Sequence, residues 1–501
     1  MTRRMIILTI LLLALGAVLT GTVLAQGPTP PAAAPAVSTQ TQACLTCHAL
    51  YTPGIVEDWR ASRHSQKTPA AALQVPPAER RVSSDTIPDA MKSVAVGCFE
   101  CHGQNAAAHK DSFQHNGFQI SVIVSPNDCK TCHSAEVAQY AGSKKANAKG
   151  NLGKNAVYTA LVETLTGVKQ VKDGKLSTDK ASEITKGQTC YACHGTEVTV
   201  NGTKKVATKL GEIEVPNLVN WPNQGVGRVN PDGSLGSCTA CHPRHAFSIE
   251  VARKPYACSQ CHLEPDVPAW DVYKESKHGN MVFSQVEDVN WESVPWKVGK
   301  DFRAPSCATC HNSLIVNANG ETIAPRTHDF GSRLWVRLMG LVYSHPQPKT
   351  GDTSVIKNKD GLPLPTAFTG ELASDFLIDK AEQDKRQTTM RGVCTGCHST
   401  TWTNQHFANM DNALVESDKM TVAATLLLVK AWDEGLADKT NPFDEALEQK
   451  WVKQWLFYAN SVRYATAMPG APDYAAFKNG WWELTNNLQE MNDLMELKRK
   501  K

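Results

Sequence analysis

The chain has 501 residues, which is enough for two to four ordinary domains. Its 52 lysines and arginines nearly balance its 49 aspartates and glutamates, and the formal net charge is +3. Such a small charge at this length argues against a nucleic-acid-binding protein and against a protein held on an anionic membrane surface. The basic residues 498–501 are interpreted as a solvated tail.

Residues 1–25 are predicted to be a secretion signal. Two arginines open the segment, a long apolar run follows, and Val23 and Ala25 satisfy the small-residue rule of a cleavage site. The length of the apolar run also fits an uncleaved membrane anchor, so both outcomes stay open. Either one predicts an exported protein. Residues 26–42 are rich in Pro, Ala and Thr and are expected to form a flexible linker.

All sixteen cysteines lie in Cys-x-x-Cys-His motifs, two to a motif, which gives eight motifs. Numbered in chain order as motifs 1 to 8, their cysteines are Cys44 and Cys47, Cys98 and Cys101, Cys129 and Cys132, Cys190 and Cys193, Cys238 and Cys241, Cys258 and Cys261, Cys307 and Cys310, and Cys394 and Cys397. Two thiols of such a motif form thioethers to one haem, and the adjacent histidine binds its iron. Zinc sites and disulfides give no reason for a histidine after every second cysteine. The sequence therefore predicts eight covalently bound c-type haems and a redox function.

The motifs are irregularly spaced, which argues against a solenoid repeat. We expect a mainly α fold in which residues 43–400 form an octahaem cytochrome c domain, with short helices at the motifs and long loops elsewhere. Motifs 5 and 6 begin at Cys238 and Cys258, so their haems must lie near each other. Pro and Gly punctuate residues 346–368, which are predicted to form a loop or β-hairpin insertion.

Residues 401–501 lack cysteine and are predicted to form a C-terminal bundle of long helices. The first helix is expected to end at Gly435, and Asn441 before Pro442 is predicted to cap the second. Each of the later helices carries one apolar face, formed by Trp451, Trp455, Tyr458 and Val462, and by Leu484, Leu488, Met491 and Met495. These faces fit packing within one chain, and they also fit a bundle that joins subunits.

Half of the sixteen histidines are motif histidines and therefore proximal iron ligands. They are His48, His102, His133, His194, His242, His262, His311 and His398. An electron-carrying haem is often capped by a second histidine, whereas a haem that acts on a small molecule keeps one side open. The eight remaining histidines allow eight capped haems, or seven capped haems and one open haem.

Seven of the remaining histidines are predicted to be distal iron ligands. They are His64, His115, His245, His278, His328, His345 and His406. His109 lies close to His115 before motif 3, and at most one of the two need be a ligand. We favour His115 and treat His109 as surplus.

The stretch between motifs 4 and 5 resembles a known family. It reads WPNQGVGRVNPDGS at residues 221–234 and continues with CTACHPRHAFS at residues 238–248. This long stretch is similar to the octahaem hydroxylamine oxidoreductases, and the similarity extends across the other motifs and the C-terminal helices. The resemblance implies that the fourth haem is catalytic and open, which here is the haem on Cys190 and Cys193 with His194 as its only protein ligand. It also implies seven electron-carrying haems and a homotrimer joined through the C-terminal helices.

The chain departs from this family after motif 6, where the family often carries an Asp-His pair that handles substrate protons. Asp266 matches the acid, but Val267 replaces the histidine. Because valine cannot transfer a proton, Asp266, a water or another residue must take that role. His194 and Asp266 are therefore the candidate catalytic residues.

A second departure concerns the tyrosine that oxidative members cross-link to the catalytic haem. Residues 464–474 offer no secure match to it and look more like the reductive members. The resemblance thus favours an exported enzyme that reduces nitrite or hydroxylamine. Oxidation of hydroxylamine or hydrazine is one alternative, and an electron carrier with every iron capped is another. The expected partners are a small nitrogen substrate and a redox cytochrome or quinone-linked protein, with no nucleic acid and with membrane contact only if the signal is uncleaved.

Overall fold

The computed structural model describes residues 34–500, so the predicted signal at 1–25 and the first part of the predicted linker lie outside the described residues. Helix α2 (Thr39–Tyr51) begins inside the predicted linker, which makes the last residues of the range 26–42 helical rather than flexible. The reason is local, because the Ser38 side chain accepts a hydrogen bond from the backbone N–H of Thr41 and caps the helix.

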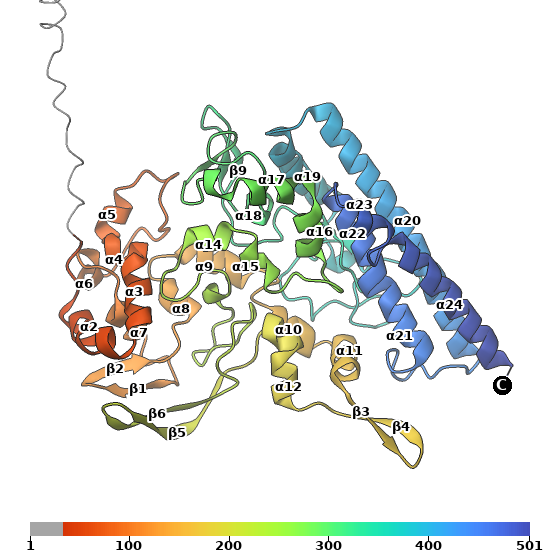
Figure 1. Cartoon of the computed structure of the whole chain (residues 1–501), viewed down its shortest axis with the longest axis horizontal. Coiled ribbons are helices and arrows are strands. Elements are labelled where there is room, and N and C mark those ends of the chain that lie inside the picture. Colours follow the sequence, from red (N-terminus) through yellow and green to blue (C-terminus); the bar gives the residue numbers. More distant parts are fainter. Residues whose placement is uncertain (1–33, 501) are drawn as a thin grey trace, which may run out of the picture.

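The helices of the motif region are short and lie between loops (Figure 1). They are α3 (Pro53–Ala61), α4 (Arg63–Gln66), α5 (Pro69–Leu73), α6 (Asp89–Lys92), α7 (Cys98–His102), α8 (Pro126–Cys129), α9 (Ser134–Ala141), α10 (Ala148–Gly153), α11 (Ala156–Thr166), α12 (Glu183–Gln188), α13 (Cys190–His194), α14 (Ile249–Arg253), α15 (Tyr256–Ser259), α16 (Ala269–Glu275), α17 (Lys277–Ser284), α18 (Cys307–His311) and α19 (Lys380–Thr395), with 3-10 turns at Cys238–Ala240, Val286–Asp288 and Ser374–Phe376. Helices α7, α13 and α18 coincide with motifs 2, 4 and 7. The prediction of a mainly α fold with short helices at the motifs is confirmed.

The strands form small antiparallel hairpins and one three-stranded sheet. They are β1 (Ser112–His115) with β2 (Phe118–Ser121), β3 (Val168–Lys172) with β4 (Lys175–Asp179), β5 (Thr199–Thr208) with β6 (Gly211–Val219), β10 (Val336–Arg337) with β11 (His345–Pro346), and β7 (Trp296–Lys297), β8 (Ile315–Val316) and β9 (Thr322–Ala324). In β1–β2 the turn residues Asn116 and Gly117 both have positive φ, at 49° and 84°, as a two-residue hairpin of type I′ requires. The predicted insertion at 346–368 is mainly loop after β11.

The C-terminal helices lie side by side at one end of the molecule (Figure 1). They are α20 (Thr400–Asp433), α21 (Ala446–Val452), α22 (Ala459–Ala467), α23 (Pro472–Ala476) and α24 (Trp481–Arg499), and a π-helical segment, Lys453–Tyr458, joins α21 to α22. Gly435 follows the first helix with φ 68°, as predicted. Within residues 34–500, no helix is both long enough and apolar enough to cross a membrane.

The predicted start of the second C-terminal helix was wrong. Helix α21 begins at Ala446, because Glu445 and Glu448 form a reciprocal capping box there. The side-chain amide of Asn441 instead donates to Thr164 Oγ1 at 3.2 Å, which ties the preceding loop to α11.

The apolar faces of the C-terminal helices meet in a side-chain core. Trp451 and Trp455 are each 1% exposed, and Met491 and Met495 pack into the same cluster from α24. Burial of each such large side chain contributes roughly 1.5–3 kcal/mol before packing terms. In the motif region the hydrophobic clusters are smaller, and the one around Trp296 packs beneath motif 7.

Candidate haem and catalytic sites

The cysteines of different motifs lie against one another. None of the sixteen, all of which fall within residues 34–500, forms a disulfide. Thiol contacts join Cys44 with Cys98, Cys129 with Cys238, Cys193 with Cys261, and Cys258 with Cys307. These contacts make motif 1 a neighbour of motif 2, motif 3 of motif 5, and motif 6 of both motif 4 and motif 7.

Three further pairs of cysteines from different motifs interact electrostatically, and these pairs link the remaining motifs. Cys132 raises the pKa of Cys101, Cys258 raises that of Cys241, and Cys394 raises that of Cys310. The order of neighbours is therefore 1, 2, 3, 5, 6, 7 and 8, with motif 4 attached to motif 6 as a side branch.

Three predicted distal histidines lie opposite a motif histidine. The ring centroids are 6.2 Å apart for His48 and His115, 6.3 Å for His64 and His133, and 6.0 Å for His278 and His398. An iron between two imidazoles needs a metal–nitrogen bond of about 2 Å on each side, which together with the ring radii gives roughly 6 Å. The residues present therefore fit a haem iron at these positions.

Two further predicted distal histidines interact electrostatically with a motif histidine. His245 lies in the field of His102, and His328 lies in the field of His242. Burial lowers the pKa of His328 and of His242 to about 4. The rings therefore stay neutral, and a neutral imidazole keeps the lone pair that a metal requires.

His345 and His406 lie in different surroundings. His345 is buried, donates from Nδ1 to the Pro346 carbonyl at 2.7 Å, and faces Arg337 across β10 and β11. His406 stacks on Trp402 at 5.4 Å, and Trp402 stacks on His398 at 4.0 Å. These contacts set neither ring opposite a motif histidine, so both ligand roles stay predictions.

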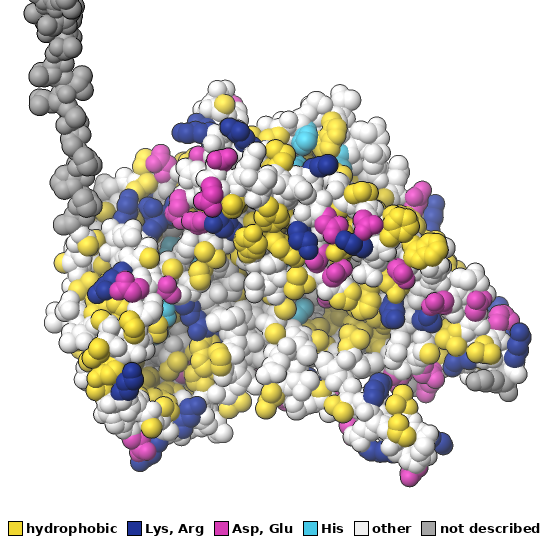
Figure 2. All heavy atoms as spheres, in the orientation of Figure 1, with side chains coloured by type: hydrophobic (Ala, Val, Ile, Leu, Met, Phe, Trp, Pro, Cys, Tyr) yellow, Lys and Arg dark blue, Asp and Glu magenta, His cyan; other side chains and the backbone are white. Residues whose placement is uncertain are grey.

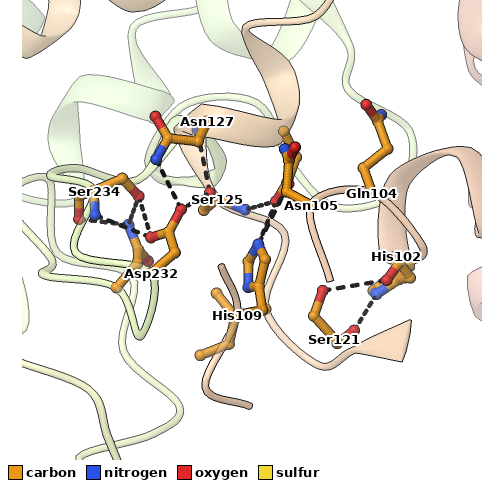
Figure 3. A network of polar contacts seen from close by, with 12 residues as sticks. His102, Gln104, Asn105, His109, Ser121, Ser125, Asn127, Asp232 and Ser234 are labelled. Atoms are coloured by element: carbon orange, nitrogen blue, oxygen red, sulfur yellow. Dashed lines mark hydrogen bonds and ion pairs between the residues drawn. The ribbon is translucent and has the colours of Figure 1, made fainter. Parts of the chain in front are cut away.

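His109 lies in a buried polar network (Figure 3). Its Nδ1 is 3.1 Å from Asp111 Oδ1, its Nε2 is 3.1 Å from Asp128 Oδ2, and all three side chains are at most 1% exposed. An imidazole that donates from both nitrogens is the charged form and has no lone pair for iron. His109 thus joins the loop after motif 2 to the start of motif 3.

The segment that carries the family resemblance packs directly on motif 4. Gly195 follows His194 with φ 94°, and a Cβ there would approach the backbone N of Arg228 to 2.2 Å. A Cβ at Gly227 would approach the carbonyl of His194 to 2.6 Å. The ring of His194 also points Nδ1 toward the Ala148 carbonyl at 3.4 Å, a contact that orients a metal-binding histidine. Gly195 and Gly227 are therefore needed for the close approach of this segment to motif 4.

Asp266 and Arg337 interact electrostatically with motif 4, and Tyr464 interacts with both of them. The negative charge of Asp266 raises the pKa of the Cys190 and Cys193 thiols, and the positive charge of Arg337 lowers the pKa of His194. Tyr464 belongs to α22, and both Arg337 and Asp266 influence the pKa of its hydroxyl. The sequence predicted a role for Asp266 but not for Arg337. Arg337 lies in a strand of two residues, and nothing in the sequence around it indicates that it lies near motif 4.

The titration of these groups suits proton donation. Although Asp266 is exposed, the surrounding protein raises the pKa of its carboxyl above the usual value. Burial raises the pKa of Tyr464 to about 12, so its hydroxyl stays protonated. The Asp266 carbonyl accepts a hydrogen bond from Asn460 Nδ2 at 2.9 Å, which fixes the loop to α22. Val267, in the place of the family's histidine, is 9% exposed.

The chain matches two families of multihaem cytochromes. Residues 231–321 match the family described as seven times multi-haem cytochrome CxxCH, and residues 43–122 and 128–214 match cytochrome c554 and c-prime. A solved structure described as a hypothetical multiheme protein is 44% identical, with a TM-score of 0.87 over 92% of this chain and 96% of that chain.

Two similar proteins come from Kuenenia stuttgartiensis. One is described as a probable nitrite reductase–hydroxylamine oxidoreductase fusion protein and is 23% identical over 409 residues, which is 78% of this chain. The chain spans 38% of the length of that relative. The other belongs to a reducing HAO-like protein complex, with 17% identity and a TM-score of 0.60 over 92% of this chain and 85% of that chain, and this likeness concerns the fold alone.

Proposed function

The chain belongs to the multihaem c-type cytochromes of the hydroxylamine oxidoreductase family, and from this premise we propose that it reduces nitrite or hydroxylamine at motif 4. The observation that carries this proposal is the electrostatic influence of Asp266 and Arg337 on motif 4, together with Tyr464, which interacts with both of them. A motif that only carries electrons needs a second imidazole rather than an acid, a cation and a phenol.

The cofactors would be one c-type haem per motif, eight in all, and the haems would supply the iron and would pass on electrons from an external donor. His194 would hold the iron of the fourth haem from one side, and Cys190 and Cys193 would fix its edge. The thiol contact between Cys193 and Cys261 would bring the haem of motif 6 close enough to exchange electrons with it.

The charged and protonated groups favour reduction. Arg337 would attract the anion nitrite, whereas hydroxylamine and hydrazine are neutral and gain less from a cation. Asp266, with its raised pKa, would deliver a proton, and the Tyr464 hydroxyl would donate a hydrogen bond to an oxygen of the substrate. Asp266 would thereby cover the proton role that Val267 cannot fill.

The direct test measures reduction of nitrite and of hydroxylamine by the holoprotein with a low-potential dye as electron donor. Asp266→Asn is expected to lower kcat by about 10²–10⁴-fold, because it removes the proton donor. Glu264→Gln, in the same loop, is the matched control and should leave kcat unchanged. Arg337→Gln is expected to raise KM for nitrite more than KM for hydroxylamine.

Two alternatives would give different results. Hydroxylamine or hydrazine oxidation would appear as rapid reduction of the haems on adding either compound. An electron carrier with all irons capped would give only low-spin ferric signals in an electron paramagnetic resonance spectrum and no change on adding nitrite. Either result would overturn the proposal, whereas a high-spin signal that nitrite alters supports it.

We also propose that the protein is exported and forms a homotrimer through its C-terminal helices, with a cytochrome or quinone-linked protein as redox partner. The C-terminal region exposes hydrophobic side chains (Figure 2), among which Val415 is 55%, Leu426 59% and Trp482 57% exposed. Exposed hydrophobic side chains on these helices favour contact with a partner. Light scattering on the holoprotein would give the mass of the assembly, and Leu426→Asp should lower it if the face joins subunits.

A further inference from the structure

We propose that Arg228 and Arg244 bind a propionate carboxylate of the haem of motif 2. The two arginines meet at the ring of Trp221, and all three residues lie within residues 221–244. The proposal requires a haem on motif 2, but it does not depend on the reaction proposed for motif 4.

The two guanidinium groups lie over one indole ring. The Cζ atom of Arg244 is 4.8 Å from the centroid of the Trp221 ring, and the Cζ atom of Arg228 is 5.2 Å from it. Both distances are within the roughly 6 Å over which the face of an indole attracts a cation. The tryptophan therefore brings two positive charges together at one place.

The two arginines differ in their hydrogen-bond partners. Arg228 is 2% exposed, and it donates from Nε to Asn230 Oδ1 at 2.7 Å and from Nη1 to the Asn223 carbonyl at 2.9 Å. These acceptors are neutral, so they fix the guanidinium without cancelling its charge. Arg244 is half-buried, and its Nη2 atom is buried without a hydrogen-bond acceptor among residues 34–500. A buried N–H group that lacks an acceptor is unfavourable, and more so when it is charged.

No acid within residues 34–500 offsets the charge of Arg244. Burial lowers the pKa of its guanidinium, and no carboxylate acts in the opposite direction. Burial and the charge of Arg244 together lower the pKa of Arg228 to about 10. Asp232 also influences Arg228, but its carboxylate accepts hydrogen bonds from two serine hydroxyls instead. Two neighbouring cations without a paired acid favour an anionic ligand, and a carboxylate fits because a guanidinium can donate to it from two nitrogens at once.

The position of Arg244 in the chain assigns the site to the haem of motif 2. Arg244 directly precedes His245, and burial, His102 and Arg244 all lower the pKa of His245. Burial and the charge of Arg244 also lower the pKa of His102. The pKa of His242, only two residues before Arg244, is lowered instead by burial and by His133. Arg244 therefore lies beside the two histidines that would bind the iron of motif 2.

A c-type haem carries the required anions itself. Its thioethers form at the two vinyl positions, and its two propionate carboxylates extend from the opposite edge of the ring. The cysteines of motif 2 lie on α7 and would fix the vinyl edge, so the propionates would point away from α7. A cation beside a haem favours the reduced form, because reduction adds negative charge. Arg244 would therefore raise the reduction potential of the haem of motif 2.

The test uses the full-length holoprotein with a heavy carbon isotope in the propionate carboxyls, introduced by feeding the labelled haem precursor aminolevulinate. Redox-difference infrared spectroscopy then separates the propionates from aspartate and glutamate. Arg244→Gln is expected to shift a labelled carboxylate band and to lower the midpoint potential of one haem per chain in a spectroelectrochemical titration.

A second variant keeps the test valid if Arg244→Gln binds fewer haems, which the pyridine haemochrome assay would show. Arg244→Lys retains the charge but cannot donate from two nitrogens. It should still shift the labelled band, while the midpoint potential falls less than in Arg244→Gln. Labelled bands that are the same in the wild type and in both variants would overturn the proposal.

Lys254→Gln is the matched control. Lys254 also lies over an indole ring, that of Trp291 at 5.9 Å, but it is paired with Glu250. Its labelled bands should match those of the wild type.

A free anion at the two arginines would give a different result. The labelled bands would then be the same in the wild type and in Arg244→Gln, and added phosphate would shift the midpoint potential of the wild type alone. That result would overturn the assignment to a propionate. Failure of the reaction proposed for motif 4 would appear separately, as a wild-type spectrum that nitrite does not alter, with the effect of Arg244→Gln on the labelled band intact.

Discussion

The motif region and the C-terminal bundle fill their interiors in different ways. In the bundle, tryptophans, leucines and methionines from several helices close around one another, and Trp451 and Leu447 are at most 1% exposed. In the motif region, nearly all of the cysteines and the motif histidines are only half-buried, although burial lowers the pKa of several of these histidines. The bundle is therefore held by its own side chains, whereas the motif region is arranged around the haems.

The largest expected effect follows from removing the haems. A chain produced without haem attachment should lose hydrogen-exchange protection across residues 43–400, because the free energy of haem attachment and iron binding is part of the folding free energy there. The helices α20 to α24 should keep much of their protection. Hydrogen-exchange mass spectrometry of both forms measures this protection. Equal loss of protection in the motif region and in the bundle would contradict the difference between the two regions.

Trp451→Ala tests the side-chain core. Removing this buried ring should lower the free energy of unfolding by about 3–5 kcal/mol, through lost burial and the cavity left behind. The visible spectrum should not change, because the residue lies in the bundle. Guanidinium unfolding followed by far-ultraviolet circular dichroism measures the effect. Trp482→Ala, at a site that is 57% exposed, is the matched control with a much smaller expected loss.

His109 gives the motif region a stabilising contact that depends on pH. Burial alone would lower the pKa of His109, but hydrogen bonds to Asp111 and Asp128 raise it to about 10. An unfolded chain releases this proton near pH 6.5, so the stabilisation is complete below that pH and is lost as pH rises to about 10. Over this window the free energy of unfolding should fall by about 1.4 kcal/mol per pH unit more steeply than in His109→Gln. Parallel pH profiles would contradict the charged form.

The smallest expected effect concerns the surface of the bundle. Arg499 pairs with Glu434 at 2.7 Å, where both side chains are about one-third exposed. Arg499→Ala should cost about 0–1 kcal/mol of unfolding free energy, less at high salt, because water and ions screen such a pair. A loss as large as that of Trp451→Ala would show that ion pairs rather than side-chain burial hold the bundle.

The sequence predicted the features that repeat or alternate. The motifs predicted the short helices and the haem attachment. The apolar faces predicted the helical path from α21 to α22 and the helix α24, and Gly435 marked the end of α20. It missed what depends on contacts between distant segments. Arg337 reaches motif 4 from a two-residue strand, and the start of α21 depends on Glu445 rather than on Asn441.

The position of motif 6 has a consequence for how the chain tolerates damage. Motif 4 contacts the other motifs through Cys261, while two arms lead away from motif 6, one through motifs 5, 3, 2 and 1 and the other through motifs 7 and 8. In this arrangement electrons could reach motif 6 along either of two arms, and both routes to motif 4 would pass through motif 6. Loss of a haem at the end of one arm would leave electron transfer along the other arm intact. Loss of the haem at motif 6 would separate motif 4 from both arms.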